Sequence, residues 1–192
     1  MKRIIYVLVL ICIFGIAAWL VTKFNGFTSF EVGEEVDNFH GVPVFYNGHI
    51  DHVSGRNTAA DGYNIGLKYQ CVEFVKRYYY EHLKHKMPDS YGHAKDFFDK
   101  KLADGERNKR RGLTQFSNPS NSRPQVSDLV VFNGGTYGHV AIISAVSENE
   151  VEIIQQNPGP YSSSRETFAL EAKDDKWYIK SQQLLGWLRK VD

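Results

Sequence analysis

Residues Asp128 to Gln156 carry the clearest structural pattern in this 192-residue chain. They contain three apolar runs, which are DLVVF at Asp128–Phe132, HVAIISAV at His139–Val146 and VEIIQQ at Val151–Gln156. Each run has the length and the β-branched composition of a strand, and short turns with glycine or asparagine separate them. Strands joined by such turns pair antiparallel. We therefore expect a three-stranded antiparallel meander at the centre of a domain.

Helices are predicted on the N-terminal side of this meander. Residues Gln70–Lys86 carry apolar side chains at helical spacing, and the helix is expected to stop before Pro88. A second helix is predicted at Ala94–Leu102, and residues 103–127 read as loops. Further strands are predicted at Gly41–Tyr46, Trp177–Lys180 and Leu184–Val191. The whole pattern indicates an α+β domain in which N-terminal helices pack on an antiparallel sheet.

Composition excludes several classes of protein and of site. The chain is 42% hydrophobic, so it can bury a core, and its net charge of +1 argues against a nucleic-acid partner. Two cysteines are too few for a disulfide framework or a cysteine zinc site. The groups His49, Asp51, His52 and Glu81, His82, His85 have ligand-type side chains without a metal-binding order. We expect no metal and no cofactor.

The N-terminus has the pattern of a membrane anchor. Ile4–Val21 is a run of 18 uncharged residues, which is just long enough to cross the hydrocarbon core of a bilayer as one helix. Lys2 and Arg3 precede it, so the N-terminus is expected in the cytoplasm and the rest outside, either periplasmic or extracellular. The alternative is a cleaved signal peptide with its cleavage site near Gly15-Ile16-Ala17.

These segments divide the chain into three parts. Residues 1–23 are predicted to form the transmembrane anchor or signal peptide, with 4–21 in contact with lipid. Residues 24–40 are mixed and acidic and read as a linker, and 41–192 read as the folded domain.

Cys71 is the candidate nucleophile, because it falls at the first turn of the predicted helix. A helix N-terminus stabilises a thiolate, and its free N–H groups can hold an oxyanion. His139 is the best placed of seven histidines to act as base, since it begins a strand after a glycine-rich turn. The next strand brings Gln155 and Asn157 back near His139, and an amide could fix its tautomer. The alternative for Cys71 is a buried thiol that acts as a small hydrophobe.

Three blocks of this sequence together carry a resemblance to a known family. YQCVEF at Tyr69–Phe74, GHVAII at Gly138–Ile143 and the pair Gln156-Asn157 resemble the CHAP family of cysteine, histidine-dependent amidohydrolases/peptidases. The similarity is strongest to the amidase domain of glutathionylspermidine synthetase/amidase, including LGW at Leu185–Trp187, and it spans roughly residues 40–190. This resemblance implies a papain-like fold.

The resemblance also implies roles for particular residues. Cys71 corresponds to the nucleophile and His139 to the general base. The third catalytic member is usually an acid, and Gln155 stands at that position here. Asn157 matches an asparagine that is common in the family site. Either Asn157 takes over from the missing acid, or a nearby carboxylate such as Glu152 does, although Glu152 and Gln155 point to opposite sides of a regular strand.

Other positions are expected to bind the oxyanion and the substrate. Gln70 could donate its side-chain N–H to the oxyanion, together with the backbone of Cys71. Lys76 stands where the family often has arginine, and Lys76 and Gly138 are expected to contact substrate.

The sequence therefore predicts a membrane-anchored cysteine amidohydrolase or peptidase that cleaves amide bonds. Export favours a peptidoglycan peptide as substrate. The alternative enzyme acts on a polyamine–glutathione conjugate, as the resemblance implies. A third possibility is a catalytically weak domain that binds peptide or glycan, because Gln155 cannot stabilise an imidazolium by charge.

Overall fold

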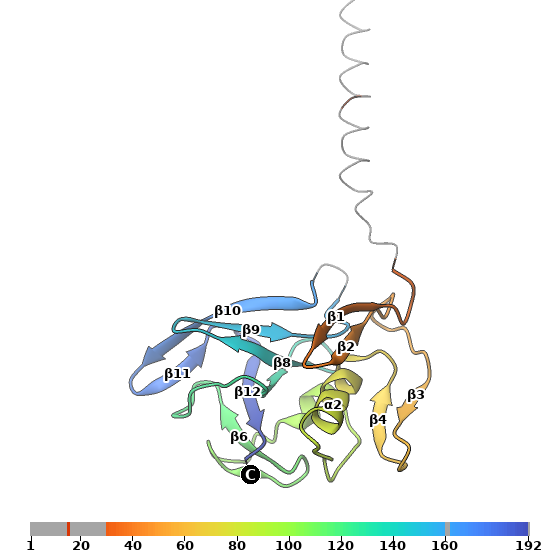
Figure 1. The fold of residues 1–192 in the computed structure, drawn as a ribbon. Coiled ribbons are helices and arrows are strands. Elements are labelled where there is room, and N and C mark those ends of the chain that lie inside the picture. The colour runs from red at the N-terminus through yellow and green to blue at the C-terminus, as the bar shows by residue number, and fades with distance from the viewer. Residues whose placement is uncertain (1–14, 16–29, 160–161, 192) are drawn as a thin grey trace, which may run out of the picture. The chain divides into compact units, whose positions relative to one another are not determined.

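An eight-stranded antiparallel sheet forms the centre of the chain in the computed structural model, which describes residues 15, 30–159 and 162–191 (Figure 1). Its strand order is β11-β10-β9-β8-β7-β12-β6-β5. The bounds are β5 Arg107–Asn108, β6 Leu113–Ser117, β7 Leu129–Phe132, β8 His139–Val146, β9 Glu150–Ile154, β10 Arg165–Lys173, β11 Lys176–Ile179 and β12 Leu184–Arg189.

Two small antiparallel pairs and one α-helix accompany this sheet. β1 (Glu35–Phe39) pairs with β2 (Val42–Phe45), and β3 (Arg56–Thr58) pairs with β4 (Asn64–Leu67). The helix α2 (Cys71–Glu81) contacts β2, β4 and β8 (Figure 1). A short 3-10 helix, η1 (Ala94–Phe97), contacts β7 and β8.

The predicted meander is confirmed as β7, β8 and β9. Alternate residues of these strands enter two separate cores, one on each face of the sheet. Val140 and Ile142 pack in the core beneath α2, whereas Ala141 and Ile143 pack in the core on the opposite face. Burial on both faces explains why the runs read as nearly continuous apolar sequence rather than as alternating polar and apolar residues.

The predicted nucleophile helix begins one residue after the predicted start and ends five residues earlier than predicted. Phe74, Val75, Tyr78 and Tyr79 are its buried face. After Glu81 the chain turns away, and Lys84 adopts a φ of +53°, which an α-helix does not contain.

The predicted fold class is wrong, because the described chain is mainly sheet and contains one α-helix. The second predicted helix is only the 3-10 helix η1, and the predicted loops at 103–127 contain β5 and β6. The side chain of Gln115 on β6 accepts from Asp99 N at 2.9 Å and donates to Asp99 O at 2.9 Å. This tertiary contact takes the backbone groups that a longer helix would use. The strand β10 was also missed.

The predicted transmembrane helix and single-pass localisation are also corrected. Within residues 15, 30–159 and 162–191, no helix is both long and apolar enough to cross a membrane. Apart from Gly15, the predicted span at 4–21 lies outside the described residues.

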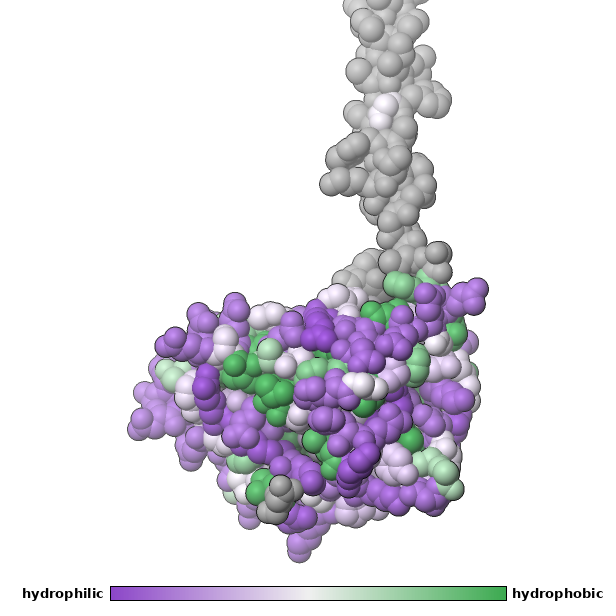
Figure 2. All heavy atoms as spheres, in the orientation of Figure 1, coloured by the Kyte–Doolittle hydropathy of each residue, from purple (hydrophilic) through white to green (hydrophobic). Residues whose placement is uncertain are grey.

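The predicted linker at 24–40 differs from the structure at its C-terminal end. Residues 35–39 form β1, because Val36 and Phe39 pack against the core while the Asp37 carboxylate pairs with Arg165 of β10. Glu31–Asp192 together form one compact unit. Figure 2 shows that hydrophilic residues cover most of one face of this unit, with hydrophobic residues in small groups.

Candidate active site

The Cys71 thiol lies at the first turn of α2 and is half-buried against the start of β8. Burial raises the pKa of this thiol, whereas hydrogen bonds from the backbone of Val140, Val72 and Cys71 itself lower it. The Val140 backbone follows directly after His139. The fold thus brings the Cys71 thiol to the backbone of the residue that follows the predicted base, although 68 positions separate Cys71 from His139 in the sequence.

The His139 ring is held by Gln155. The His139 Nε2 atom lies 3.0 Å from Gln155 Oε1, and Gln155 Nε2 donates to the Ser163 carbonyl at 3.0 Å. Because the amide nitrogen is already a donor to Ser163, its oxygen must accept from His139. The proton of the neutral ring is therefore on Nε2, which leaves the Nδ1 lone pair free to accept a proton.

Burial lowers the pKa of His139 to about 4, and the hydrogen bond with Gln155 opposes this effect only in part. The imidazole is therefore neutral at pH 7, and so is the Cys71 thiol with its raised pKa. Both shifts favour the neutral forms of the thiol and of the imidazole over a thiolate–imidazolium pair.

Glu152 does not contact His139. Its carboxylate accepts from Ser144 Oγ at 2.6 Å and from Arg165 Nη1 at 2.9 Å. The nearby acid considered from the sequence thus faces another network.

Asn157 contacts Gln70. Asn157 Nδ2 donates to Gln70 Oε1 at 2.8 Å and to Ile50 O at 2.9 Å. Gln70 Nε2 in turn donates to His52 O at 2.8 Å and to Ile50 O at 3.3 Å. One of these two bonds must break before Gln70 can donate to an oxyanion. The oxyanion role of Gln70 and the catalytic role of Asn157 stay predictions.

The two predicted substrate-binding residues lie in different surroundings. Lys76 is buried, and its ammonium donates to the carbonyls of Asn64 and Ser90, at 2.7 Å for Ser90. Burial lowers the pKa of Lys76 to about 8. Gly138 precedes His139 with a φ of +74°, and a Cβ there would lie 2.6 Å from the Phe132 carbonyl oxygen. Their substrate contacts stay predictions.

The sequence around this site matches a known protein family. A family model for the CHAP domain matches residues 60–157, which include the Cys71 helix, His139 and Gln155. This match covers just over half of the chain.

The chain belongs to the CHAP family. It is a hydrolase that acts on amide bonds, as the sequence predicts.

Two relatives from Crithidia fasciculata are similar to this CHAP protein. Trypanothione synthetase is 28% identical over 144 residues, which cover 72% of this chain and 22% of the relative. Glutathionylspermidine synthase is 28% identical over 179 residues, which cover 77% of this chain and 25% of the relative. The chain thus spans about a quarter of the length of these relatives. The resemblance to the glutathionylspermidine proteins is confirmed.

A buried polar cluster beneath the CHAP site was not predicted from the sequence. The Gln156 side chain donates to Glu73 Oε2 at 2.9 Å and to Gln70 O at 3.0 Å, and accepts from Phe45 N at 2.8 Å. Arg77 Nε lies 2.7 Å from Glu73 Oε1. Charged residues on a helix are usually exposed, so the pattern alone gave no reason to place Glu73 and Arg77 inside. The position of Gln156 beside Asn157 in the motif was the available signal.

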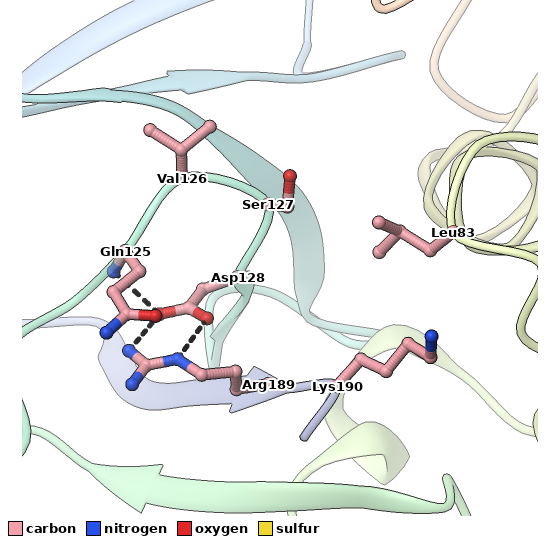
Figure 3. Close-up of a pocket in the computed structure, with 7 residues that line it drawn as sticks. All are labelled: Leu83, Gln125, Val126, Ser127, Asp128, Arg189 and Lys190. Atoms are coloured by element: carbon pink, nitrogen blue, oxygen red, sulfur yellow. Dashed lines mark hydrogen bonds and ion pairs between the residues drawn. The ribbon is translucent and has the colours of Figure 1, made fainter. Parts of the chain in front are cut away.

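Two cavities are lined by residues outside this site. One of about 190 Å³ is lined by Leu83, Gln125, Val126, Ser127, Asp128, Arg189 and Lys190 (Figure 3). Its Asp128 carboxylate pairs with the Arg189 guanidinium at 2.6 Å (Figure 3). This ion pair links β12 to the start of β7. Another cavity, of about 350 Å³, lies by Tyr80, Glu81, Lys84 and Lys86.

Proposed function

We propose that this CHAP domain hydrolyses an amide bond with Cys71 as nucleophile and His139 as general base. The contact between His139 Nε2 and Gln155 Oε1 at 3.0 Å carries the proposal, because it leaves Nδ1 as the basic nitrogen. The hydrogen bond between Val140 and the Cys71 thiol supports it further.

The proposed reaction has two stages. As the Cys71 sulfur attacks the carbonyl carbon, His139 Nδ1 takes the thiol proton and then gives it to the leaving nitrogen, so that the C–N bond breaks and a thioester forms. Water then attacks the thioester, loses a proton to His139 and releases the acid, and the thiol takes that proton back. The backbone N–H groups at the start of α2 stabilise the oxyanion in both stages.

The substrate class that we propose is a glutathione–polyamine conjugate of the glutathionylspermidine type. Its support is the similarity to glutathionylspermidine synthase over 77% of this chain. Such a conjugate contains an amide between a peptide carboxyl group and a polyamine nitrogen. The sequence favours peptidoglycan peptides through predicted export alone, and neither relative adds support for that substrate.

The test uses the full chain and purified glutathionylspermidine, with free glutathione and spermidine measured by mass spectrometry. Wild type should release both, and Cys71→Ala and His139→Ala should reduce release by at least about 10³-fold. Cys12→Ala is the matched control and should behave as wild type. Soluble cell-wall peptides are the comparison substrate. Faster cleavage of wall peptides would overturn the substrate assignment, and Cys71-independent activity would overturn the mechanism.

A further inference from the structure

The Gln155 side chain has a third polar partner besides His139 and Ser163. Its Nε2 atom donates to Glu166 Oε2 on β10 at 3.4 Å, as well as to the Ser163 carbonyl. Both partners are acceptors, so both hydrogens of the amide nitrogen point away from His139. A chain of contacts therefore runs from Glu166 through the Gln155 amide to the His139 ring.

The pairing of β9 with β10 explains why Glu166 lies there. Glu166 is opposite Ile153 and Arg165 is opposite Ile154, and Gln155 N donates to Ser164 O at 2.8 Å. Because neighbouring residues of a strand face opposite sides, Arg165 and Glu166 point to opposite sides of the sheet. Arg165 binds Asp37 and Glu152, whereas Glu166 faces Gln155.

The charge of Glu166 is not neutralised locally. Within residues 30–159 and 162–191 its carboxylate has no ion pair, and the side chain is exposed at the strand surface. The other carboxylate near the site, Glu73, is paired with Arg77 and lies under α2. Among the described residues, Glu166 is thus the charged side chain that hydrogen bonds link to His139 through Gln155.

We propose that Glu166 is a positioning residue, which fixes and polarises the Gln155 amide so that its oxygen holds the His139 ring. A hydrogen bond from the amide nitrogen to a carboxylate increases the negative charge on the amide oxygen. That oxygen then stabilises the imidazolium that forms when His139 takes the thiol proton. This inference rests on the proposed function and adds a residue to it.

The test is Glu166→Gln in the full chain, with glutathionylspermidine as the probe. Glutamine keeps an acceptor for Gln155 and removes only the charge. We expect kcat to fall about fivefold with KM unchanged, and the acid limb of the kcat/KM profile to move about half a pH unit lower. The control is Glu171→Gln on the same strand, whose carboxylate pairs with Lys180, and its profile should not move.

A second background separates positioning from structure. In Gln155→Glu the amide is gone and a carboxylate contacts His139 directly, so Glu166→Gln should no longer lower kcat. An equal loss in both backgrounds, or a Glu166→Gln profile identical to that of Glu171→Gln, would overturn this inference alone. If the Cys71→Ala variant kept the activity of the wild type, the proposed function and this inference would both be overturned.

Discussion

The Gln156 amide donates to the Glu73 carboxylate at 2.9 Å, and this contact joins the end of β9 to the first turn of α2. Gln156 also binds Phe45 N and Gln70 O, so one buried side chain connects β2, the residue before Cys71 and the helix that carries Cys71. Because Gln155 lies next to it, the same strand end positions the nucleophile and the base.

Gln156→Leu should destabilise the domain. It leaves the Phe45 N–H without its partner and removes one hydrogen bond each from the Gln70 carbonyl and Glu73 Oε2, which keep Phe74 N and Arg77. These losses cost about 3 kcal/mol together. The measurement is the free energy of unfolding by denaturant. Gln182→Leu at an exposed position is the control and should change it by less than about 0.5 kcal/mol. Equal stability of the two variants would contradict the structural role of Gln156.

Gly138→Ala should lower kcat/KM strongly while the domain stays folded. The added Cβ would lie 2.6 Å from Phe132 O and 2.9 Å from Lys95 N, so the turn before His139 must shift. A displacement of about 1 Å at His139 should cost about 10²-fold in kcat/KM. Gly135→Ala has a similar φ of +61° and open space around its Cβ, and it controls for backbone strain. A similar loss in both variants would attribute the effect to strain.

Gln155→Glu should shift the pH dependence toward higher pH. A carboxylate beside His139 favours the imidazolium, so the His139 pKa should rise from about 4 by one to three units. The acid limb of the kcat/KM profile should move to higher pH by the same amount. The rate at pH 8 should increase up to about tenfold. Asn149→Asp adds the same charge in the exposed turn after β8, at the opposite end of that strand from His139, and should leave the acid limb in place. An unmoved limb in Gln155→Glu would remove His139 from the role of base.

The buried neutral His139 should make stability depend on pH. Its pKa is about 4 in the folded protein and about 6.5 in the unfolded chain, so between these values the unfolded chain binds more protons. Stability therefore falls as pH drops through this window. At pH 5 the protonation of His139 in the unfolded chain should lower the free energy of unfolding by about 2 kcal/mol. Denaturant unfolding of wild type and His139→Asn at pH 7 and 5 measures it. The variant should lose less stability between the two pH values, and an identical loss would contradict a buried neutral ring.

The Cys71 thiol should titrate above the ordinary value of about 8.5, because burial raises its pKa. The measurement is the rate of iodoacetamide alkylation of the Cys71 peptide against pH, compared with a short model peptide. In Gln155→Glu the imidazolium should shift the rate profile to lower pH. A wild-type thiol that reacts with an apparent pKa well below 8.5 would indicate a preformed thiolate–imidazolium pair instead.

Local sequence was enough to identify the central strands and the helix that carries Cys71. Apolar runs of strand length predicted β7, β8 and β9, and helical spacing predicted the start of α2. These elements were readable because each one buries its own apolar residues, which leaves a periodic pattern. The family resemblance rested on the residues around Cys71, His139 and Asn157, which also lie within or next to these elements.

Elements whose form depends on distant partners were not predictable in this way. The second predicted helix became η1 because Gln115 binds the backbone of Asp99, and β1 formed within a predicted linker because Val36 and Phe39 reach the core. β10 was missed since its pattern is mostly polar and exposed. None of these outcomes follows from the residues of the segment itself.

Residue types and spacing were enough to predict the family, the reaction class and the candidates Cys71 and His139. The surroundings of these residues came from the fold, which gives His139 its hydrogen bond with Gln155, lowers the His139 pKa and links Gln155 to Glu166. The physical reason is that pKa values and tautomers depend on burial and on hydrogen-bond partners, which the fold brings together from separate strands.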